Sequence, residues 1–301
     1  MAGSIQWRGV FPALTTKFKA NDALDFEAMA AHLEFQLEAG VHGIIILGSL
    51  GENATLDMAE KLEMVAFFRK QIGQRAPLVA CIAESGTREA LHFLNKATEA
   101  GADGFMLLPP MRYASDRRET LHYLRTIGAA STRPIMLYNN PVAYGTDISP
   151  ADFAGLTDVE TFEAIKESAA DPRRFPDLRR HCGDRYALFC GVDDLAFECF
   201  ALGAVGWVAG LVVAFPKETL RLYELMTAGE WEAARRLYEW FLPLLHLDIG
   251  PKFVQQIKLV EALHGVGSAR VRAPRLELDE AEQVQVREIY ERAMATRPDV
   301  P

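Results

Sequence analysis

Short apolar runs alternate with longer amphipathic stretches through most of the chain. The runs cover residues 9–16, 43–49, 77–84, 104–110, 134–141, 161–168, 186–191 and 206–212. Runs of about four to eight apolar residues are typical of buried parallel strands. The stretches between them, such as "DFEAMAAHLEFQLEAG" (25–40), have helical spacing, and several end in glycine, a common helix stop. Eight strand–helix units in succession predict an α/β fold, a (β/α)8 TIM barrel.

The main alternative for this pattern is a doubly wound open sheet. Such a sheet often carries a glycine-rich phosphate loop after its first strand. The first run here is followed by "TKFKANDALD" (16–25), which has no GxGxxG pattern, so the barrel is favoured. Three more helical patterns follow the eighth unit without a Pro-, Ser- or Gly-rich linker. We therefore predict a barrel over residues 1–228 and a C-terminal helical extension over residues 229–301, packed on the barrel.

Composition and charge exclude several classes of protein. The 301 residues carry a formal net charge of −9, whereas broad binding to nucleic acid or anionic membranes requires a basic surface. No apolar run reaches the roughly 18 residues of a membrane span. The stretch "MAGSIQWRGVF" (1–11) has no long apolar segment, so we expect no export and a cytoplasmic location. The cysteines form no CxxC pair and are expected to be reduced thiols: Cys81, Cys182, Cys190 and Cys199.

Catalytic groups of a TIM barrel lie at the C-terminal ends of its strands. None of the seven histidines ends a predicted strand. A catalytic zinc needs several converging ligands, so we expect no metal. The sequence also has no nicotinamide or flavin fingerprint, so we expect no organic cofactor. One reactive group remains at a strand end, the amine of Lys166 in "TFEAIKES" (161–168).

Lys166 is costly to bury, because its ammonium loses hydration. Ser168, two residues later, faces the same side of the strand, and Tyr138 ends the preceding strand, one βα unit earlier. Desolvation lowers the pKa of a lysine and favours a nucleophilic amine. Such an amine can form a Schiff base with a 2-oxo acid, while a phenol and a serine hydroxyl relay protons. The alternative interpretation is a solvated lysine on an amphipathic segment.

Six motifs in order resemble those of one enzyme family. They are "GVFPALTTKF", "GIIILGSLGEN", "YNNP", "AIKES", "GVDD" and "GAVGWVAG". Together they resemble the dihydrodipicolinate synthase / N-acetylneuraminate lyase family of lysine-dependent aldolases, over roughly residues 8–295. The resemblance implies a (β/α)8 barrel with a helical extension, usually a homotetramer.

The resemblance also implies roles for individual residues. The Schiff-base lysine matches Lys166 and the proton-relay tyrosine matches Tyr138. The loop that binds the 2-oxo acid carboxylate matches Ser49 and Leu50 in "GSLGEN", and Ser49 is expected to be a catalytic residue beside Lys166 and Tyr138. The remaining substrate-binding positions are expected to be Ser168, Gly191 in "GVDD" and Val208 in "GAVGWVAG".

Three departures from the family pattern bear on the substrate. Leu50 stands where the family often has Thr or Asn, which removes one hydroxyl from the carboxylate site. The synthase usually carries an arginine for a second carboxylate where this chain has Ala143, and Met111 lies near the place of a relay tyrosine borrowed from a neighbouring subunit. Whether Tyr113 or Tyr144 compensates, or only packs in a loop, stays open at this point.

The departures favour some members of the family over others. "GSLGEN", "YNNPVAYG" and "VRAPRL" look most like members of the 1-pyrroline-4-hydroxy-2-carboxylate deaminase or 2-keto-3-deoxy-L-arabonate dehydratase type. We expect a lyase acting on a small 4-hydroxylated 2-oxo acid or its cyclic imine. The alternatives are a 4-hydroxy-2-oxoglutarate or 2-keto-3-deoxy sugar-acid aldolase, a dihydrodipicolinate synthase, in which Arg112 could replace the missing arginine, and an inactive barrel that binds 2-oxo acids.

Overall fold

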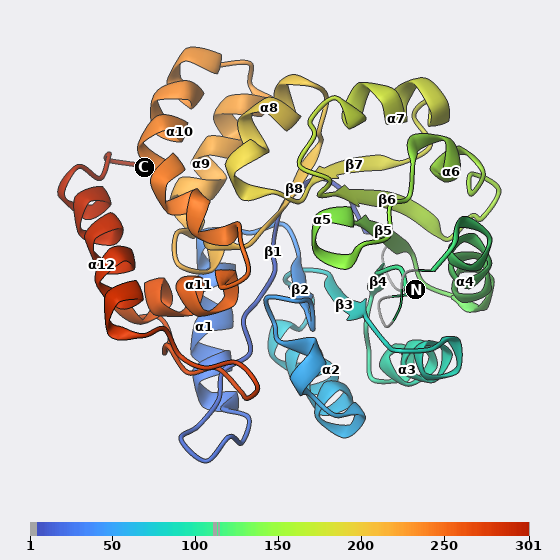
Figure 1. The fold of residues 1–301 in the computed structure, drawn as a ribbon, viewed down its shortest axis with the longest axis horizontal. Coiled ribbons are helices and arrows are strands. Elements are labelled where there is room, and N and C mark those ends of the chain that lie inside the picture. Colours follow the sequence, from blue (N-terminus) through green and yellow to red (C-terminus); the bar gives the residue numbers. More distant parts are fainter. Residues whose placement is uncertain (1–4, 111–112, 114, 301) are drawn as a thin grey trace.

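A computed structural model describes residues 5–110, 113 and 115–300. Its strands form one parallel sheet in the order β1-β8-β7-β6-β5-β4-β3-β2 (Figure 1). The strands are β1 (Gly9–Pro12), β2 (Ile44–Ile46), β3 (Leu78–Ile82), β4 (Gly104–Leu107), β5 (Ile135–Asn139), β6 (Phe162–Glu167), β7 (Ala187–Cys190) and β8 (Gly206–Ala209). A parallel bridge between Ala13 and Ile45 joins β1 to β2 and closes the ring. Every strand lies inside one of the eight apolar runs, so the predicted (β/α)8 barrel is confirmed.

Helices follow each strand and surround the barrel (Figure 1). They are α1 (Phe26–Ala39), α2 (Met58–Ile72), α3 (Thr87–Glu99), α4 (Arg117–Ala130), α5 (Pro141–Tyr144), α6 (Pro150–Ala154), α7 (Arg174–Cys182), α8 (Ala196–Ala201) and α9 (Pro216–Thr227). Capping boxes start α2 at Asp57 and α4 at Asp116, where each carboxylate accepts from a backbone N–H that the first turn leaves unpaired. Gly40 ends α1 in the left-handed region, at a φ of 92°.

Three further helices form the C-terminal part of the chain: α10 (Trp231–Leu245), α11 (Phe253–Leu263) and α12 (Glu280–Ala295). They match the three helical patterns read from the sequence. Helix α10 packs on α9, and α12 packs on α10 and α11, so they cover one side of the barrel (Figure 1). The division of the chain at residue 228 stays a prediction.

Aromatic rings fill the barrel below its mouth. Phe11 on β1 and Phe189 on β7 pack edge to face, with ring centroids 5.4 Å apart. Glycines just before β2 and at the start of β8 leave room for these rings, because a Cβ on Gly43 would lie 2.2 Å from Phe11 and one on Gly206 would lie 2.3 Å from Phe189. The interior is therefore a packed core, and substrate has access only at its ends.

Two chain-wide expectations can be compared with the structure. All four cysteines are free thiols, as predicted. Within residues 5–110, 113 and 115–300, no helix is long and apolar enough to cross a membrane.

Candidate active site

Lys166 and Tyr138 meet at the mouth of the barrel. They are register partners on the adjacent strands β6 and β5, so the predicted neighbourhood is observed. The Lys166 Nζ lies 4.0 Å from the centroid of the Tyr138 ring. Only 8% of Lys166 and 6% of Tyr138 is exposed. The solvated-lysine interpretation is therefore wrong, because this amine is enclosed by the barrel and lies on an aromatic face.

A second tyrosine joins this pair, and sequence reasoning had left it open. Tyr144 ends the short helix α5, and its ring packs edge to face on Tyr138 at 5.6 Å. Its hydroxyl is in a short hydrogen bond with the Ser49 hydroxyl, and Tyr138 Oη accepts from Asn140 Nδ2 at 3.1 Å. Burial and the neighbouring phenol raise the pKa of Tyr144 well above its usual value. Ser49, Tyr144 and Tyr138 thus form a row of hydroxyl groups beside Lys166.

The other tyrosine considered from the sequence lies elsewhere. Tyr113 is 59% exposed, so it is a surface residue of this chain. Met111 and Arg112, also singled out from the sequence, lie outside the described residues.

The loop after β2 has an unusual backbone. Leu47 and Glu52 have φ angles of 64° and 56°, in the left-handed region that residues with a Cβ seldom adopt. Thr16 Oγ1 donates to the Gly51 carbonyl at 2.6 Å and holds the loop against the end of β1. Among the described residues, none accepts a hydrogen bond from the backbone N–H of Ser49 or of Leu50. Two free N–H groups beside a hydroxyl suit a carboxylate, even though Leu50 offers only an apolar side chain.

Ser168 and Gly191 lie on the other side of Lys166. Ser168 Oγ donates to the Gly191 carbonyl at 2.9 Å. A Cβ on Gly191 would lie 2.6 Å from Lys166 Cε and 2.1 Å from Ser168 Oγ, so only glycine leaves the lysine room here. Val208 is 2% exposed on β8, two residues after Gly206, and so faces the interior as Gly206 does. All seven residues predicted from the sequence therefore lie at or just after the C-terminal ends of strands of the same barrel.

A polar network behind β5 and β6 holds the segment that carries Tyr144. Asn139 Nδ2 donates to Glu167 Oε1 at 3.0 Å, and its Oδ1 accepts from Ile148 N at 2.9 Å. Arg174 donates to Glu167 Oε2 at 3.0 Å and to the Ile148 carbonyl at 2.6 Å. Sequence reasoning missed this network. Its signal was present in the polar residues that alternate with Tyr138 and Lys166 along the two strands and so face outward.

The C-terminal helices also reach the mouth of the barrel. Lys258 of α11 is in a buried ion pair with Glu52 of the β2 loop, with 2.5 Å between Nζ and Oε1. Glu261, one turn later, accepts from Thr15 Oγ1 at 2.8 Å and pairs with Lys17 at 2.6 Å. These contacts tie the candidate carboxylate loop and the end of β1 to the extension. No sequence signal placed them together.

The sequence matches one family of known proteins over nearly its whole length. Residues 6–293 match the dihydrodipicolinate synthetase family. The chain belongs to this family. It is 32% identical to the 4-hydroxy-tetrahydrodipicolinate synthase of Geotalea uraniireducens, over 93% of this chain and 96% of that protein.

Solved structures of the family share the fold. Dihydrodipicolinate synthase from Aquifex aeolicus is 26% identical, with a TM-score of 0.91, over 95% of this chain and 97% of that one. YagE of E. coli K12, a prophage protein of the dihydrodipicolinic acid synthase family, was solved in complex with pyruvate. It is 25% identical, with a TM-score of 0.90, over 96% of this chain and 99% of that one.

Family members are lysine-dependent class I aldolases and lyases, and this chain is an enzyme of that kind. The arrangement at the mouth fits such chemistry. An amine at the end of β6 can add to a carbonyl, phenols beside it can move protons, and a loop with free N–H groups can hold a carboxylate.

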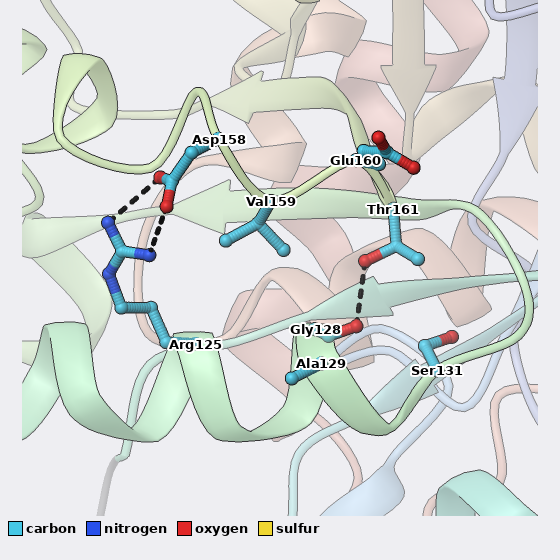
Figure 2. Close-up of a pocket in the computed structure, with 8 residues that line it drawn as sticks. All are labelled: Arg125, Gly128, Ala129, Ser131, Asp158, Val159, Glu160 and Thr161. Atoms are coloured by element: carbon cyan, nitrogen blue, oxygen red, sulfur yellow. Dashed lines mark hydrogen bonds and ion pairs between the residues drawn. The ribbon is translucent and has the colours of Figure 1, made fainter.

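A pocket of about 420 Å³ lies at the opposite end of the barrel, between the end of α4 and the segment before β6 (Figure 2). Arg125 forms two hydrogen bonds with Asp158, at 2.8 Å and 2.9 Å, so its guanidinium is already paired. Thr161 Oγ1 donates to the Gly128 carbonyl at 2.8 Å. This pocket lies at the end of the barrel away from Lys166, where the catalytic chemistry of a TIM barrel is not expected, so it is not the candidate active site.

Proposed function

We propose that this enzyme is a Schiff-base lyase acting on a small 4-hydroxylated 2-oxo acid or its cyclic imine. The types that fit are a 1-pyrroline-4-hydroxy-2-carboxylate deaminase and a 2-keto-3-deoxy-L-arabonate dehydratase. The observation that carries this choice is at position 143. Ala143 is exposed on α5, directly before Tyr144, and its N–H donates to Asn140 Oδ1 at 3.0 Å. It offers no cation where the synthase usually has an arginine for a second carboxylate.

The proposed reaction begins with attack of the Lys166 amine on C2 of the substrate. The Ser49–Leu50 loop would hold the C1 carboxylate. Loss of water from the adduct gives a protonated imine, which withdraws electrons from C3. Tyr138 would take up the C3 proton while its own hydroxyl proton passes through Tyr144 and Ser49 to solvent. The electron pair would then expel the C4 hydroxyl, which leaves as water after it receives a proton from a general acid. Hydrolysis of the imine restores the amine, and a deaminase additionally releases ammonia.

A second candidate is 4-hydroxy-tetrahydrodipicolinate synthesis, because curated relatives of this chain carry that name. A retro-aldol reaction is the third, since it starts from the same imine and breaks the C3–C4 bond instead. The synthase condenses pyruvate with aspartate semialdehyde, and 4-hydroxy-2-oxoglutarate carries two carboxylates. Position 143 disfavours substrates with a second carboxylate.

A side-by-side assay of mono- and dicarboxylate substrates tests this proposal. We expect kcat/KM to be at least tenfold higher for a pyrroline-hydroxycarboxylate or a five-carbon deoxy sugar acid than for 4-hydroxy-2-oxoglutarate. The comparison includes pyruvate with aspartate semialdehyde. A tenfold preference for a dicarboxylate would mean that another cation has replaced the missing arginine. Binding without turnover of any compound would instead indicate a 2-oxo-acid-binding barrel.

A Tyr138→Phe substitution should separate catalysis from stability. General acid–base groups contribute roughly 10²- to 10⁴-fold in rate, so kcat should fall by about that range. Thermal unfolding should change little, because the phenol lies at the open end of the barrel. Tyr223→Phe is the matched control, since Tyr223 is an equally buried tyrosine on α9, outside the barrel. If Tyr138→Phe unfolds, or keeps full activity, the proton relay is wrong.

We also propose a homotetramer, which the family resemblance implies. The cytoplasmic location and activity without a metal or an organic cofactor stay proposals from the sequence.

A further inference from the structure

The C-terminal extension places a carboxyl group at the mouth of the barrel. Asp248 ends the 3-10 helix η4 (His246–Asp248), between α10 and α11. Its side chain lies against Gly210, the residue that follows β8. A Cβ on Gly210 would lie only 2.4 Å from Asp248 Oδ1, so position 210 must be glycine for this carboxyl to be there.

A second carboxyl group lies on the other side of the same glycine. Asp193 begins the 3-10 helix η2 (Asp193–Leu195) and is fully buried. It accepts from Trp207 Nε1 at 2.9 Å, from Gly210 N at 3.1 Å and from Leu211 N at 2.8 Å. Burial raises the pKa of Asp193, whereas the N–H donors on both of its oxygens act in the opposite direction and favour its charged form.

Asp248 differs from Asp193 in its hydrogen bonding. Within the described part of the chain, no group donates a hydrogen bond to the carboxyl of Asp248, which is partly buried. Burial, first, and then the charge of Asp193 raise its pKa well above the usual value. The other groups that face it are Lys166, which acts in the opposite direction, and Asp194 and Cys190, which act in the same direction. The pKa values of both carboxyls are raised, and the N–H donors on Asp193 favour Asp248 as the site of the proton that the pair shares.

The position of Asp248 relative to Lys166 suggests what the proton is for. On the β5 side of Lys166, the mouth is filled by Tyr138 and Tyr144. On the β7 side, Gly191 has no side chain, and Asp248 lies beyond it at the end of β8. A substrate held at C2 by Lys166, with C3 toward the tyrosines, would direct its C4 substituent away from the Tyr138 ring, toward the β7–β8 side where Asp248 lies.

We propose that Asp248 is the general acid that protonates the departing C4 hydroxyl; this inference rests on the proposed function. Removal of the C3 proton leaves an electron pair that forms the C2=C3 bond of an enamine. That pair then forms C3=C4 while the C4–O bond breaks. The oxygen leaves with the proton of Asp248 as water, and the resulting carboxylate regains a proton from solvent. No oxidant or reductant is needed.

The experiment compares Asp248→Asn with wild type, with Asp184→Asn as the control at an exposed carboxylate. On the 4-hydroxylated substrate, Asp248→Asn should lower kcat roughly 10²- to 10⁴-fold. Exchange of the C3 protons of 2-oxopentanoate into deuterated water needs Lys166 and the tyrosines but no leaving group, so it should stay near the wild-type rate. The wild-type kcat should fall as pH rises through the pKa of Asp248. The Asp248→Asn variant should not show this decrease in its pH–rate profile. Unchanged turnover, or equal loss of turnover and exchange, would overturn the proposal.

Borohydride trapping distinguishes failure of the Asp248 proposal from failure of the proposed function. If wild type turns over none of the 4-hydroxylated substrates, the proposed function fails. Borohydride trapping then tests Asp248 alone, by competition between 4-hydroxy-2-oxopentanoate and 2-oxopentanoate, which differ only in the C4 hydroxyl. Wild type should be labelled preferentially by the hydroxylated acid, and Asp248→Ala should lose this preference. An unchanged preference would show that Asp248 does not meet the C4 oxygen.

Discussion

Lys166→Ala is expected to abolish turnover, with a loss on the order of 10⁴-fold or more, as for other covalent nucleophiles. The fold should survive, because the change is confined to one side chain at the mouth of the barrel and leaves the strand pairing of β6 intact. Borohydride reduction in the presence of pyruvate should add mass to the wild-type peptide that contains Lys166. The same treatment should leave the variant unlabelled. Peptide mass spectrometry measures both outcomes.

Two controls sharpen this result. Lys166→Arg keeps a cation in place but cannot form the imine, so it should be as inactive as the alanine variant. Lys61 is a second lysine near the mouth, and it is ion-paired with Glu84 at 2.8 Å. Lys61→Met should therefore still be labelled at Lys166. Labelling of any other lysine in the Lys166→Ala variant would show that the Schiff base forms elsewhere.

The sequence was sufficient for the barrel and for the meeting of Lys166 with Tyr138. Both follow from the regular spacing of apolar runs along the sequence. Each run marks a strand, and strands one βα unit apart lie side by side in the sheet. Strand ends then identify the mouth without any knowledge of the tertiary structure. Tyr144 was harder, because its position depends on α5, a helix of one turn. Asn140 and Pro141 signal its start, as N-cap and first helical residue, but its direction comes from the network around Asn139 and Arg174.

The carboxyl of Asp248 and the amine of Lys258 could not be predicted. Each lies far along the chain from the strands it meets, and neither belongs to a pattern that places the C-terminal helices over one part of the barrel. The left-handed backbone at Leu47 and Glu52 was also not predictable, because such residues carry no local signature and the surrounding contacts impose the conformation.

Lys258→Met is expected to be among the most destabilising single substitutions in the chain. The Lys258 side chain is fully buried, with its Nζ 2.5 Å from Glu52 Oε1 and 2.5 Å from the Arg270 carbonyl. Removing the amine leaves the buried Glu52 carboxylate with the Arg275 guanidinium, 3.9 Å from its Oε2, as a more distant cation. Breaking a buried ion pair in this way costs about 3–5 kcal/mol. Denaturant unfolding should show a loss of this size, and KM for a 2-oxo acid should rise, because Glu52 belongs to the candidate carboxylate loop.

The variant Lys258→Met/Glu52→Gln tests whether the buried charge of Glu52 causes the loss of stability in Lys258→Met. Glu52→Gln keeps an acceptor for the Arg272 N–H, which now lies 3.0 Å from Glu52 Oε2, but removes the charge. Lys258→Met combined with Glu52→Gln should therefore recover most of the lost stability, since removing both charges is often nearly neutral. Lys252 and Glu282 form the matched exposed pair, so Lys252→Met should cost less than about 1 kcal/mol. A double variant no more stable than Lys258→Met would mean that packing at α11, and not charge, holds the loop.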